Sequence, residues 1–448
     1  MDTTLAQHLA TFVCGLSEDT LPDTIVAKAK TCLLNGYGIA FAGLSTPYHV
    51  VAAKAASTMY TEGGNATIWA TGTRSTVTGA LMANAALCHG RAQEDTCGAA
   101  HLGAVMIPLL TALIETGRGS TEDLISALVA GYEAGGLFEE LLADQTTPTG
   151  FRATTLFGVT AAATAASRLL KFSPAQTVAA MANAVSFSGG VLQSFAEGTD
   201  EWRYQVGITA QAGWAAAELA QAGSVSAVEP FEGAKGLAKA FANTDLDVDA
   251  ITAGLGQNWQ TARVAFKPFP VCAFNQTPVT AALDIRERMK GRQVKSVDVR
   301  MNPYECGYAG MDSAGPFNSI SGTLMSIPFC IALTLVRGAP SMQSMVCYDD
   351  TEVNMLVDRI KLIPDPEIAV LSCHIFITYA DETKDQIHCK MTPQDYAYGF
   401  ADHTARLKET VAQEDLPTRG IDQIAKFSAD PAAVPLQTVL KTIANLAK

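Results

Sequence analysis

The side chains best suited to acid–base chemistry are concentrated in one short segment, residues 91–101, between two apolar stretches. Glu94, Asp95, Thr96 and His101 place two carboxylates, a hydroxyl and an imidazole in a Gly- and Ala-rich setting. Polar groups in such a setting must be hydrogen-bonded or functional, and a carboxylate–histidine pair can move protons. On this pattern alone, a capping or structural role is more common than catalysis.

The sequence indicates neither a metal nor an organic cofactor. Glu94 and Asp95 are adjacent, so on a helix their side chains would diverge by about 100° and could not share one metal ion. The ten cysteines form no CxxC pair, and no HExxH motif or facial triad occurs. Glycine-rich phosphate loops and a GxSxG nucleophile elbow are also missing. We therefore expect a site without cofactor or metal, built from side chains alone.

Two cationic residues stand next to features that could place them in a site. Arg152 precedes a predicted helix whose free N–H groups could bind an anion, although an arginine near a helix start is commonplace. Lys267 precedes the rigid bend Pro268-Phe269-Pro270 and is followed by Cys272. A lysine held at a bend near a domain boundary can be desolvated, which lowers its pKa toward that of a useful base.

The elements that must position these side chains are almost entirely helical up to about residue 265. Residues 173–176 form a strong helix start, in which a Ser N-cap, a Pro at the first position and a Gln at the third complete a capping box. Residues 153–170 and 208–220 are small and apolar on all sides, which is typical of helices buried on most faces. The sequence therefore predicts an all-α core.

After about residue 265 the pattern becomes a mixture of helices and strands. Residues 296–301 alternate between apolar and polar types, which predicts a half-buried strand. Residues 372–379 and 386–391 are separated by a turn-like segment, which predicts a hairpin. Residues 277–290 and 351–360 are expected to be helices.

We therefore predict a mainly α protein of two domains. A large all-α helical domain comprises residues 1–265 and 396–448, because helical character resumes near the end of the chain. A smaller α+β domain comprises residues 266–395, a size within the usual range for a domain.

The overall charge restricts the kinds of partner. With 31 Lys and Arg against 44 Asp and Glu, the net charge is −13, and no basic run occurs. Nucleic acid and anionic membrane surfaces are therefore poor partners. The longest uncharged stretch, residues 313–336, contains Gly315, Pro316 and Pro328 and does not resemble a membrane helix. The N-terminus has no basic region of a signal peptide, so we expect a cytoplasmic protein with reduced cysteines.

At the same segments the chain resembles the MmgE/PrpD family, which includes 2-methylcitrate dehydratase and cis-aconitate decarboxylase. The resemblance covers nearly the whole chain and rests on the order and spacing of five segments. It implies a large all-α domain, a smaller α+β lid domain, a cofactor-free active site in the cleft between them, and a homodimer. The five segments are 34–36, 79–84, 95–101, 151–152 and 267–270.

Transferred residue by residue, the resemblance is partial. His101, Asp95, Thr96 and Lys267 match positions that the family uses at its site. Other family acid–base groups fall on residues of different chemistry, which are Ala92, Arg152, Trp202, Gln205 and Cys272, with Arg203 beside Trp202. Arginine cannot exchange protons at neutral pH, but it binds carboxylates in a bidentate manner. The substitutions thus favour carboxylate binding over expulsion of a leaving group.

The resemblance therefore implies a cofactor-independent epimerase acting on a polycarboxylate such as iminodisuccinate. Arg152, Arg203 and Thr96 would bind the substrate, although Arg203 taken alone lies in a mixed-charge segment that is more often solvated. His101 and Lys267 would exchange the proton alpha to a carboxylate.

Three further side chains complete the expected site. Asp95 would orient His101, while Tyr308 and Cys272 are reserve candidates for the acid on the opposite face. The first alternative is a dehydratase or decarboxylase of a tricarboxylate. The second is a non-catalytic family member that acts as a binding protein.

Overall fold

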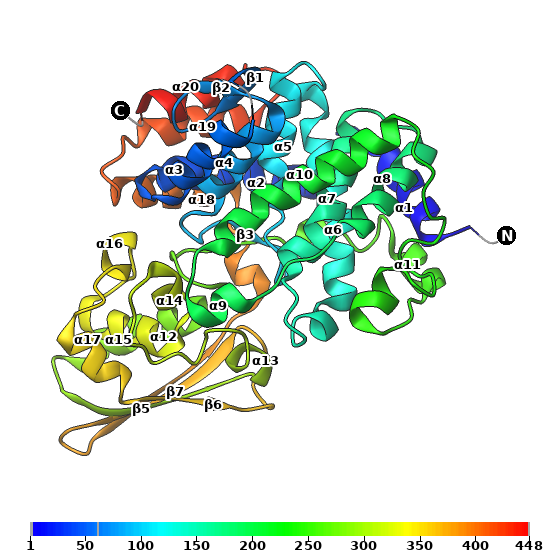
Figure 1. Ribbon diagram of the computed structural model, residues 1–448. Coiled ribbons are helices and arrows are strands. Elements are labelled where there is room, and N and C mark those ends of the chain that lie inside the picture. Colours follow the sequence, from blue (N-terminus) through cyan, green and yellow to red (C-terminus); the bar gives the residue numbers. More distant parts are fainter. Residues whose placement is uncertain (1–2, 61, 447–448) are drawn as a thin grey trace.

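The apolar side chains of this protein form two separate hydrophobic cores (Figure 1). A computed structural model describes residues 3–60 and 62–446. The larger core belongs to a helical unit, α1–α11 with α18–α20, and the smaller core to a small unit, α12–α17 with β5–β8. Four side chains from the helical part of the chain, Ala92, Leu192, Phe195 and Trp202, are packed into the smaller core.

The helical unit is built around α7 (Ala153–Leu169), which is buried along nearly its whole length. Glycines allow its neighbours to approach closely, since a Cβ atom at Gly213 would lie 2.4 Å from Cβ of Ala162. The helices of this unit are α1 (Leu5–Cys14), α2 (Asp23–Ala42), α3 (Tyr48–Met59), α4 (Val77–His89), α5 (Gly103–Glu115), α6 (Leu124–Thr146), α7, α8 (Pro174–Ser186), α9 (Gln193–Glu197), α10 (Glu201–Gln221), α11 (Val248–Gly254), α18 (Phe400–Ala412), α19 (Arg419–Ala429) and α20 (Gln437–Leu446).

Several of these helices confirm the predictions from sequence. The capping box at Ser173 and Gln176 is present at the start of α8. In the C-terminal segment, α18 and α19 lie against α2, and Leu407, Ile424 and Phe427 join the larger core. Among the described residues, no helix is both long and apolar enough to span a membrane.

The expectation of an all-α unit is wrong in detail, because two small antiparallel ribbons belong to it. One pairs β1 (Glu62–Ile68) with β2 (Thr73–Ser75). The other pairs β3 (Asp95–Thr96) with β4 (Ala265–Phe266) and joins segments that are far apart in the sequence. Strands of two or three residues carry too few side chains to show an alternating pattern.

The small unit contains a four-stranded sheet in the order β6-β5-β7-β8, in which only the β5–β6 pair is parallel. The predicted strand and hairpin are confirmed, and Val297, Val299 and Met301 of β5 are buried. The elements are β5 (Val294–Met301), β6 (Ile360–Pro364), β7 (Ser372–Tyr379), β8 (Lys384–Lys390), α12 (Gln276–Met289), α13 (Pro303–Cys306), α14 (Ile320–Met325), α15 (Ile327–Arg337), α16 (Met342–Met345) and α17 (Thr351–Val357).

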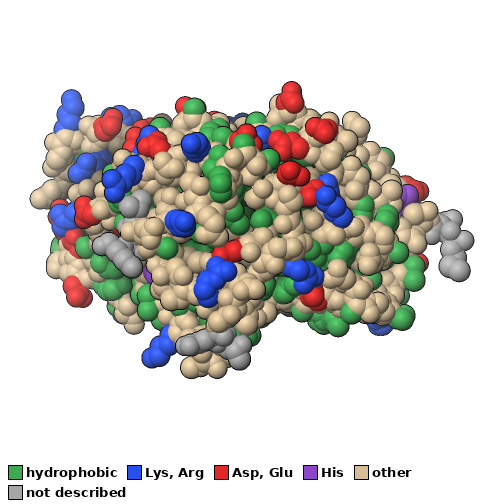
Figure 2. All heavy atoms as spheres, turned by 90° about the horizontal axis from the view of Figure 1, so that it is seen from above, with side chains coloured by type: hydrophobic (Ala, Val, Ile, Leu, Met, Phe, Trp, Pro, Cys, Tyr) green, Lys and Arg blue, Asp and Glu red, His purple; other side chains and the backbone are tan. Residues whose placement is uncertain are grey.

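The predicted helix over residues 351–360 is too long. It ends at Val357, and Ile360 begins β6, which is paired in parallel with β5. A five-residue strand that follows a helix so closely extends the helical apolar pattern, and only the partner strand reveals the change. On the face seen in Figure 2, Lys and Arg side chains lie among Asp and Glu side chains, with apolar atoms between them.

One carboxyl group of the small unit makes folding stability depend on pH. Glu305 is fully buried on α13, and its Oε1 accepts a hydrogen bond from N of Leu371 at 2.9 Å. Burial raises its pKa to about 8, so folding favours the protonated form. Stability due to this group is therefore complete below the pKa of an unfolded glutamate and is lost as pH rises toward 8.

We predict that Glu305→Gln removes this loss. Relative to the wild type, the variant should gain on the order of 4 kcal/mol of unfolding free energy between pH 5 and pH 9. Urea unfolding of both proteins at the two pH values measures the gain. A difference that does not change with pH would contradict the prediction.

Candidate active site

The β3–β4 ribbon and two helix ends bring together a cluster of charged and polar side chains. His89 is the last residue of α4, Glu94 directly precedes β3, and His101 stands two residues before α5. Lys267 directly follows β4. Because Asp95 pairs with Phe266 in the antiparallel register, the neighbouring residues Glu94 and Lys267 also lie opposite each other.

The carboxylate of Glu94 is the centre of this cluster. Its Oε1 lies 2.5 Å from Nζ of Lys267 and 3.4 Å from Nδ1 of His101, and its Oε2 lies 3.0 Å from Nδ1 of His89. Burial opposes ionisation of Glu94, but His89, Lys267 and His101 together hold its pKa well below the usual range. Glu94 is therefore an anion that organises three cationic or proton-bearing groups.

His89 has both ring nitrogens committed. Its Nε2 lies 2.6 Å from Nη2 of Arg152, which can only donate, so Nε2 accepts and Nδ1 carries the proton toward Glu94. Burial lowers the pKa of His89 to about 4, so the ring is neutral at neutral pH. His89 therefore positions Glu94 and Arg152 and has no lone pair left to act as a base.

His101 has one ring nitrogen committed and one available. Its Nδ1 lies 3.0 Å from the main-chain oxygen of Asp95 and also faces Glu94, so Nδ1 carries the proton. Nε2 then holds a lone pair, and the side chain is 17% exposed. Burial and the nearby Lys267 ammonium hold the pKa of His101 well below its ordinary value. His101 is thus a neutral imidazole that can accept a proton.

The expectation that the Asp95 side chain orients His101 is wrong. Its Oδ2 accepts hydrogen bonds from Tyr132 Oη at 2.5 Å and from N of Gly103 at 3.3 Å. Successive side chains of a strand point to opposite faces, so Asp95 points away from the side that carries Glu94. Burial raises the pKa of Asp95 to about 6. The main-chain carbonyl of Asp95, together with Glu94, holds the imidazole instead.

We predict that Asp95→Asn lowers kcat by less than about tenfold, whereas loss of a carboxylate that orients a catalytic histidine costs on the order of 10⁴. An Asn side chain can still accept a hydrogen bond from Tyr132. Steady-state kinetics of the variant with the substrate proposed below measures the effect. A loss of 10³ or more would restore the original role of Asp95.

The two arginines expected to bind carboxylates are both buried. Arg152 donates to the main-chain oxygen of Trp202 at 2.6 Å and to Oε1 of Gln205 at 2.9 Å, in addition to His89. It lies directly beside the Glu94 cluster. Burial lowers its pKa to about 10, which leaves it charged at neutral pH.

Arg203 is held by the protein itself. It donates to Asp200 at 2.9 Å, to the main-chain oxygen of Gly90 at 3.3 Å and to Oγ of Ser321. Its guanidinium carbon is 3.8 Å from the ring centroid of Tyr48 and 4.0 Å from that of Trp202. These contacts give Arg203 the place of a structural link between the helical and small units.

Tyr308 and Cys272 bring proton-bearing groups from the small unit. Burial raises the pKa of Tyr308, and the charge of Arg152 opposes this rise. Burial also raises the pKa of Cys272 to about 11, with an opposing contribution from Lys267. Both groups are therefore protonated at neutral pH, and each is close enough to a cluster cation to sense its charge. Thr96 lies on β3 and lines a cavity beside Lys267.

Comparison with known proteins identifies the family. The MmgE/PrpD N-terminal domain matches residues 7–249, and the MmgE/PrpD C-terminal domain matches residues 269–410. The chain belongs to the MmgE/PrpD family. Within residues 3–60 and 62–446, no group of three or more His, Cys, Asp and Glu side chains is arranged to hold a metal ion.

Relatives of this MmgE/PrpD protein include several cis-aconitate decarboxylases. The chain is 27% identical to that of Homo sapiens over 292 residues, covering 64% of this chain and 60% of the human protein. It is 26% identical to that of Mus musculus over 469 aligned residues, covering 99% and 91%. For Aspergillus terreus the identity is 23% over 372 residues, covering 77% and 74%. A cis-aconitate decarboxylase-like protein of Aspergillus oryzae is matched over 57% of its own length.

Sequence reasoning missed Glu94 and His89, the two residues at the centre of the cluster. The MmgE/PrpD pattern expects a carboxylate at position 92, where this chain has Ala92 in a left-handed conformation with φ of 56°. Glu94, two residues later, supplies a carboxylate to the cluster. A shift of the acidic residue within one loop was a visible signal. His89 gave none, because the end of an apolar helix is an ordinary place for a histidine.

Proposed function

We propose that this protein is a lyase that decarboxylates a tricarboxylate of the cis-aconitate type. The observation that carries the proposal is the Glu94 cluster, which commits every ring nitrogen of its two histidines except Nε2 of His101. This available nitrogen lies beside Lys267 and Arg152, the cations that a polycarboxylate needs. The names of the decarboxylase relatives support the same reaction class.

The reaction requires one bond to break and one proton to be delivered. The bond between a methylene carbon and its carboxylate breaks, and carbon dioxide leaves without the bonding electrons. The electron pair moves through the neighbouring double bond to the carbon beside a retained carboxylate, where a C–H bond forms. Lys267 and Arg152 stabilise the negative charge on the retained carboxylate, and such donors contribute about 3–4 kcal/mol each.

His101 is the proton donor in this scheme. Without substrate its ring is neutral, but a bound polycarboxylate anion raises the pKa of the adjacent imidazole, so the ring takes up a proton at Nε2. The protonated ring then delivers that proton to the carbon. Substrate binding and proton uptake are thus coupled in this site.

The experiment is to incubate the purified protein with cis-aconitate in deuterium oxide and to follow the products by ¹³C and ²H NMR. We expect release of carbon dioxide and one deuterium in the remaining dicarboxylate. Carbon dioxide release without deuterium at the new C–H position would contradict the role of His101. A protein that consumes no cis-aconitate, or that dehydrates or only isomerises it, would contradict the lyase proposal.

Epimerisation beside a carboxylate is the second candidate function, and one observation favours it. His101 is neutral before substrate binds and is ready to remove a proton, whereas Tyr308 and Cys272 of the small unit carry protons. A base and an acid from different units suit inversion of a carbon. Incubating iminodisuccinate in deuterium oxide would then give deuterium at the inverted carbon and no carbon dioxide.

The non-catalytic alternative finds little support in this arrangement. A binding protein has no need for a buried carboxylate with three ordered partners, since assembling buried charges is costly. The same charges serve a purpose when protons must move.

A further inference from the structure

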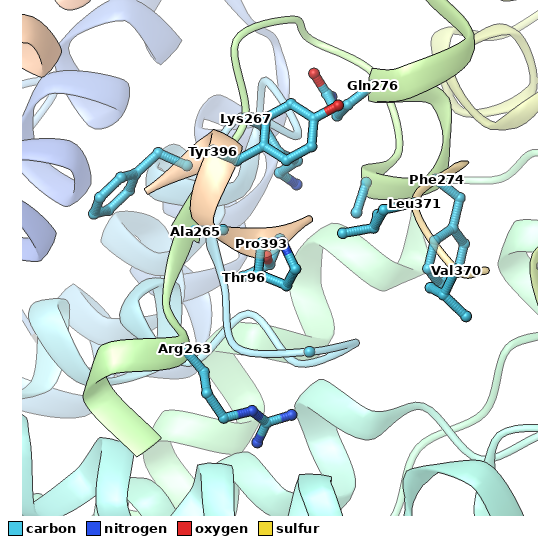
Figure 3. Close-up of a pocket in the computed structure, with 13 residues that line it drawn as sticks. Thr96, Arg263, Ala265, Lys267, Phe274, Gln276, Val370, Leu371, Pro393 and Tyr396 are labelled. Carbon is cyan, nitrogen blue, oxygen red and sulfur yellow. The ribbon is translucent and has the colours of Figure 1, made fainter. Parts of the chain in front are cut away.

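A cavity of about 150 Å³ lies beside the Glu94 cluster, between the β3–β4 ribbon and the small unit (Figure 3). Thr96, Ala265 and Lys267 line it from the ribbon and the residue that follows it. Phe274 and Leu371 line it from the small unit and, in Figure 3, lie on the side opposite Ala265. The cavity is therefore formed only where the two units meet.

The cavity walls are mostly apolar. Ala265, Phe274, Val370, Leu371 and the ring of Tyr396 supply much of the lining. A cavity of about this volume with an apolar lining stays dry and holds a molecule the size of benzene. Its natural content is thus an apolar group of about six carbon atoms.

The one cation at the far end of the cavity is already neutralised. Arg263 lies in the lining and donates to Glu139 at 3.0 Å and to Oε1 of Gln260 at 2.6 Å. A second carboxylate of a ligand would have to displace these partners. The far end therefore favours an uncharged group.

The cavity is continuous with the candidate active site through a shared residue. Lys267 lines the cavity, and its ammonium group is 2.5 Å from Glu94 in the cluster. Thr96 also lines the cavity and follows Asp95, whose carbonyl holds His101. A ligand that places a carboxylate at Lys267 can extend an adjoining substituent into the cavity.

Solvent reaches this space at its rim. Val370 is 45% exposed, and Pro393 is exposed as well. Both line the cavity. An apolar side chain at an exposed rim also offers a site where the cavity can be filled without disturbing the core.

We propose that the cavity binds an apolar substituent, up to the size of a phenyl ring, carried by the polycarboxylate substrate. The proposal rests on the proposed function in one respect, namely that a substrate carboxylate lies at Lys267. It narrows the substrate class from tricarboxylates in general to carboxylates with an alkyl or aryl group next to the Lys267-bound carboxylate.

The test compares two probes by isothermal titration calorimetry with the full-length protein. Succinate carries only the carboxylates, and phenylsuccinate adds the phenyl ring. We expect phenylsuccinate to bind the wild type at least about tenfold more tightly, because filling an apolar pocket gives a preference of that size or more. Val370→Trp, which fills the cavity from its rim, should reduce the preference to less than about threefold.

Val346→Trp is the matched control, because Val346 is 46% exposed and does not line the cavity. It should keep the full preference for phenylsuccinate. The proposal is overturned if the wild type does not prefer phenylsuccinate, or if Val370→Trp keeps the preference that Val346→Trp shows. A wild type that prefers phenylsuccinate but releases no carbon dioxide from any tricarboxylate would contradict the lyase proposal and leave the cavity assignment intact.

Discussion

Replacing His101 by alanine is expected to lower kcat by about 10²–10⁴ while KM changes little, because the proton is moved in the transition state and not in the bound ground state. The variant should also lose deuterium incorporation from solvent at the new C–H bond. Steady-state kinetics and NMR in deuterium oxide measure the two effects. Added imidazole should restore part of the rate, since the space left by the ring is partly open to solvent.

His388→Ala is a suitable control for this variant. His388 is exposed on β8, where its ring stacks on that of His374 at 3.9 Å between centroids. It should keep the wild-type kcat. If His101→Ala retains more than about a tenth of the wild-type kcat with an unchanged melting temperature, another residue moves the proton.

Replacing Glu94 by glutamine is expected to have two large effects. Removing one partner of a buried ion pair leaves Lys267 without its counterion, which costs about 3–5 kcal/mol of unfolding free energy. The loss of a group that orders His89, His101 and Lys267 should also lower kcat by about 10²-fold or more. Urea unfolding and steady-state kinetics at pH 7 measure both effects.

The pH dependence of Glu94→Gln separates an electrostatic role from a packing role. Because the carboxylate raises the pKa of both histidines, its removal should move the acid limb of the kcat/KM profile to lower pH. In the wild type the stabilisation due to Glu94 is present above the ordinary carboxyl pKa and is lost as pH falls through its depressed folded-state value. A variant with an unshifted profile and wild-type stability would show that Glu94 is not the centre of the site.

The local elements could be predicted from sequence because their signals are local. The Ser173 capping box, the apolar run of α7 and the alternation in β5 are each complete within a few residues. The pairing of β3 with β4 could not be read in this way. It joins Glu94 to Lys267 across 173 residues, and two-residue strands carry no periodicity.

The site was predictable in its membership and not in its contacts. His101, Lys267 and Arg152 do come together, and Thr96 lies beside them. Which of two adjacent carboxylates faces the imidazole depends on the phase of a strand, and a shift of one residue reverses the answer. That phase made Glu94 the central residue and turned Asp95 toward Tyr132.

The packing of Phe195 and Trp202 into the smaller hydrophobic core has a consequence for how the protein unfolds. A small unit that lacks these side chains would leave a cavity in its own core, so the two units are expected to lose their structure in one cooperative transition. Trp202 also contacts the ring of His89, with centroids 4.7 Å apart. Acid–base competence therefore appears only when the whole chain has folded, and a nascent chain that has made its helical part alone carries no working site.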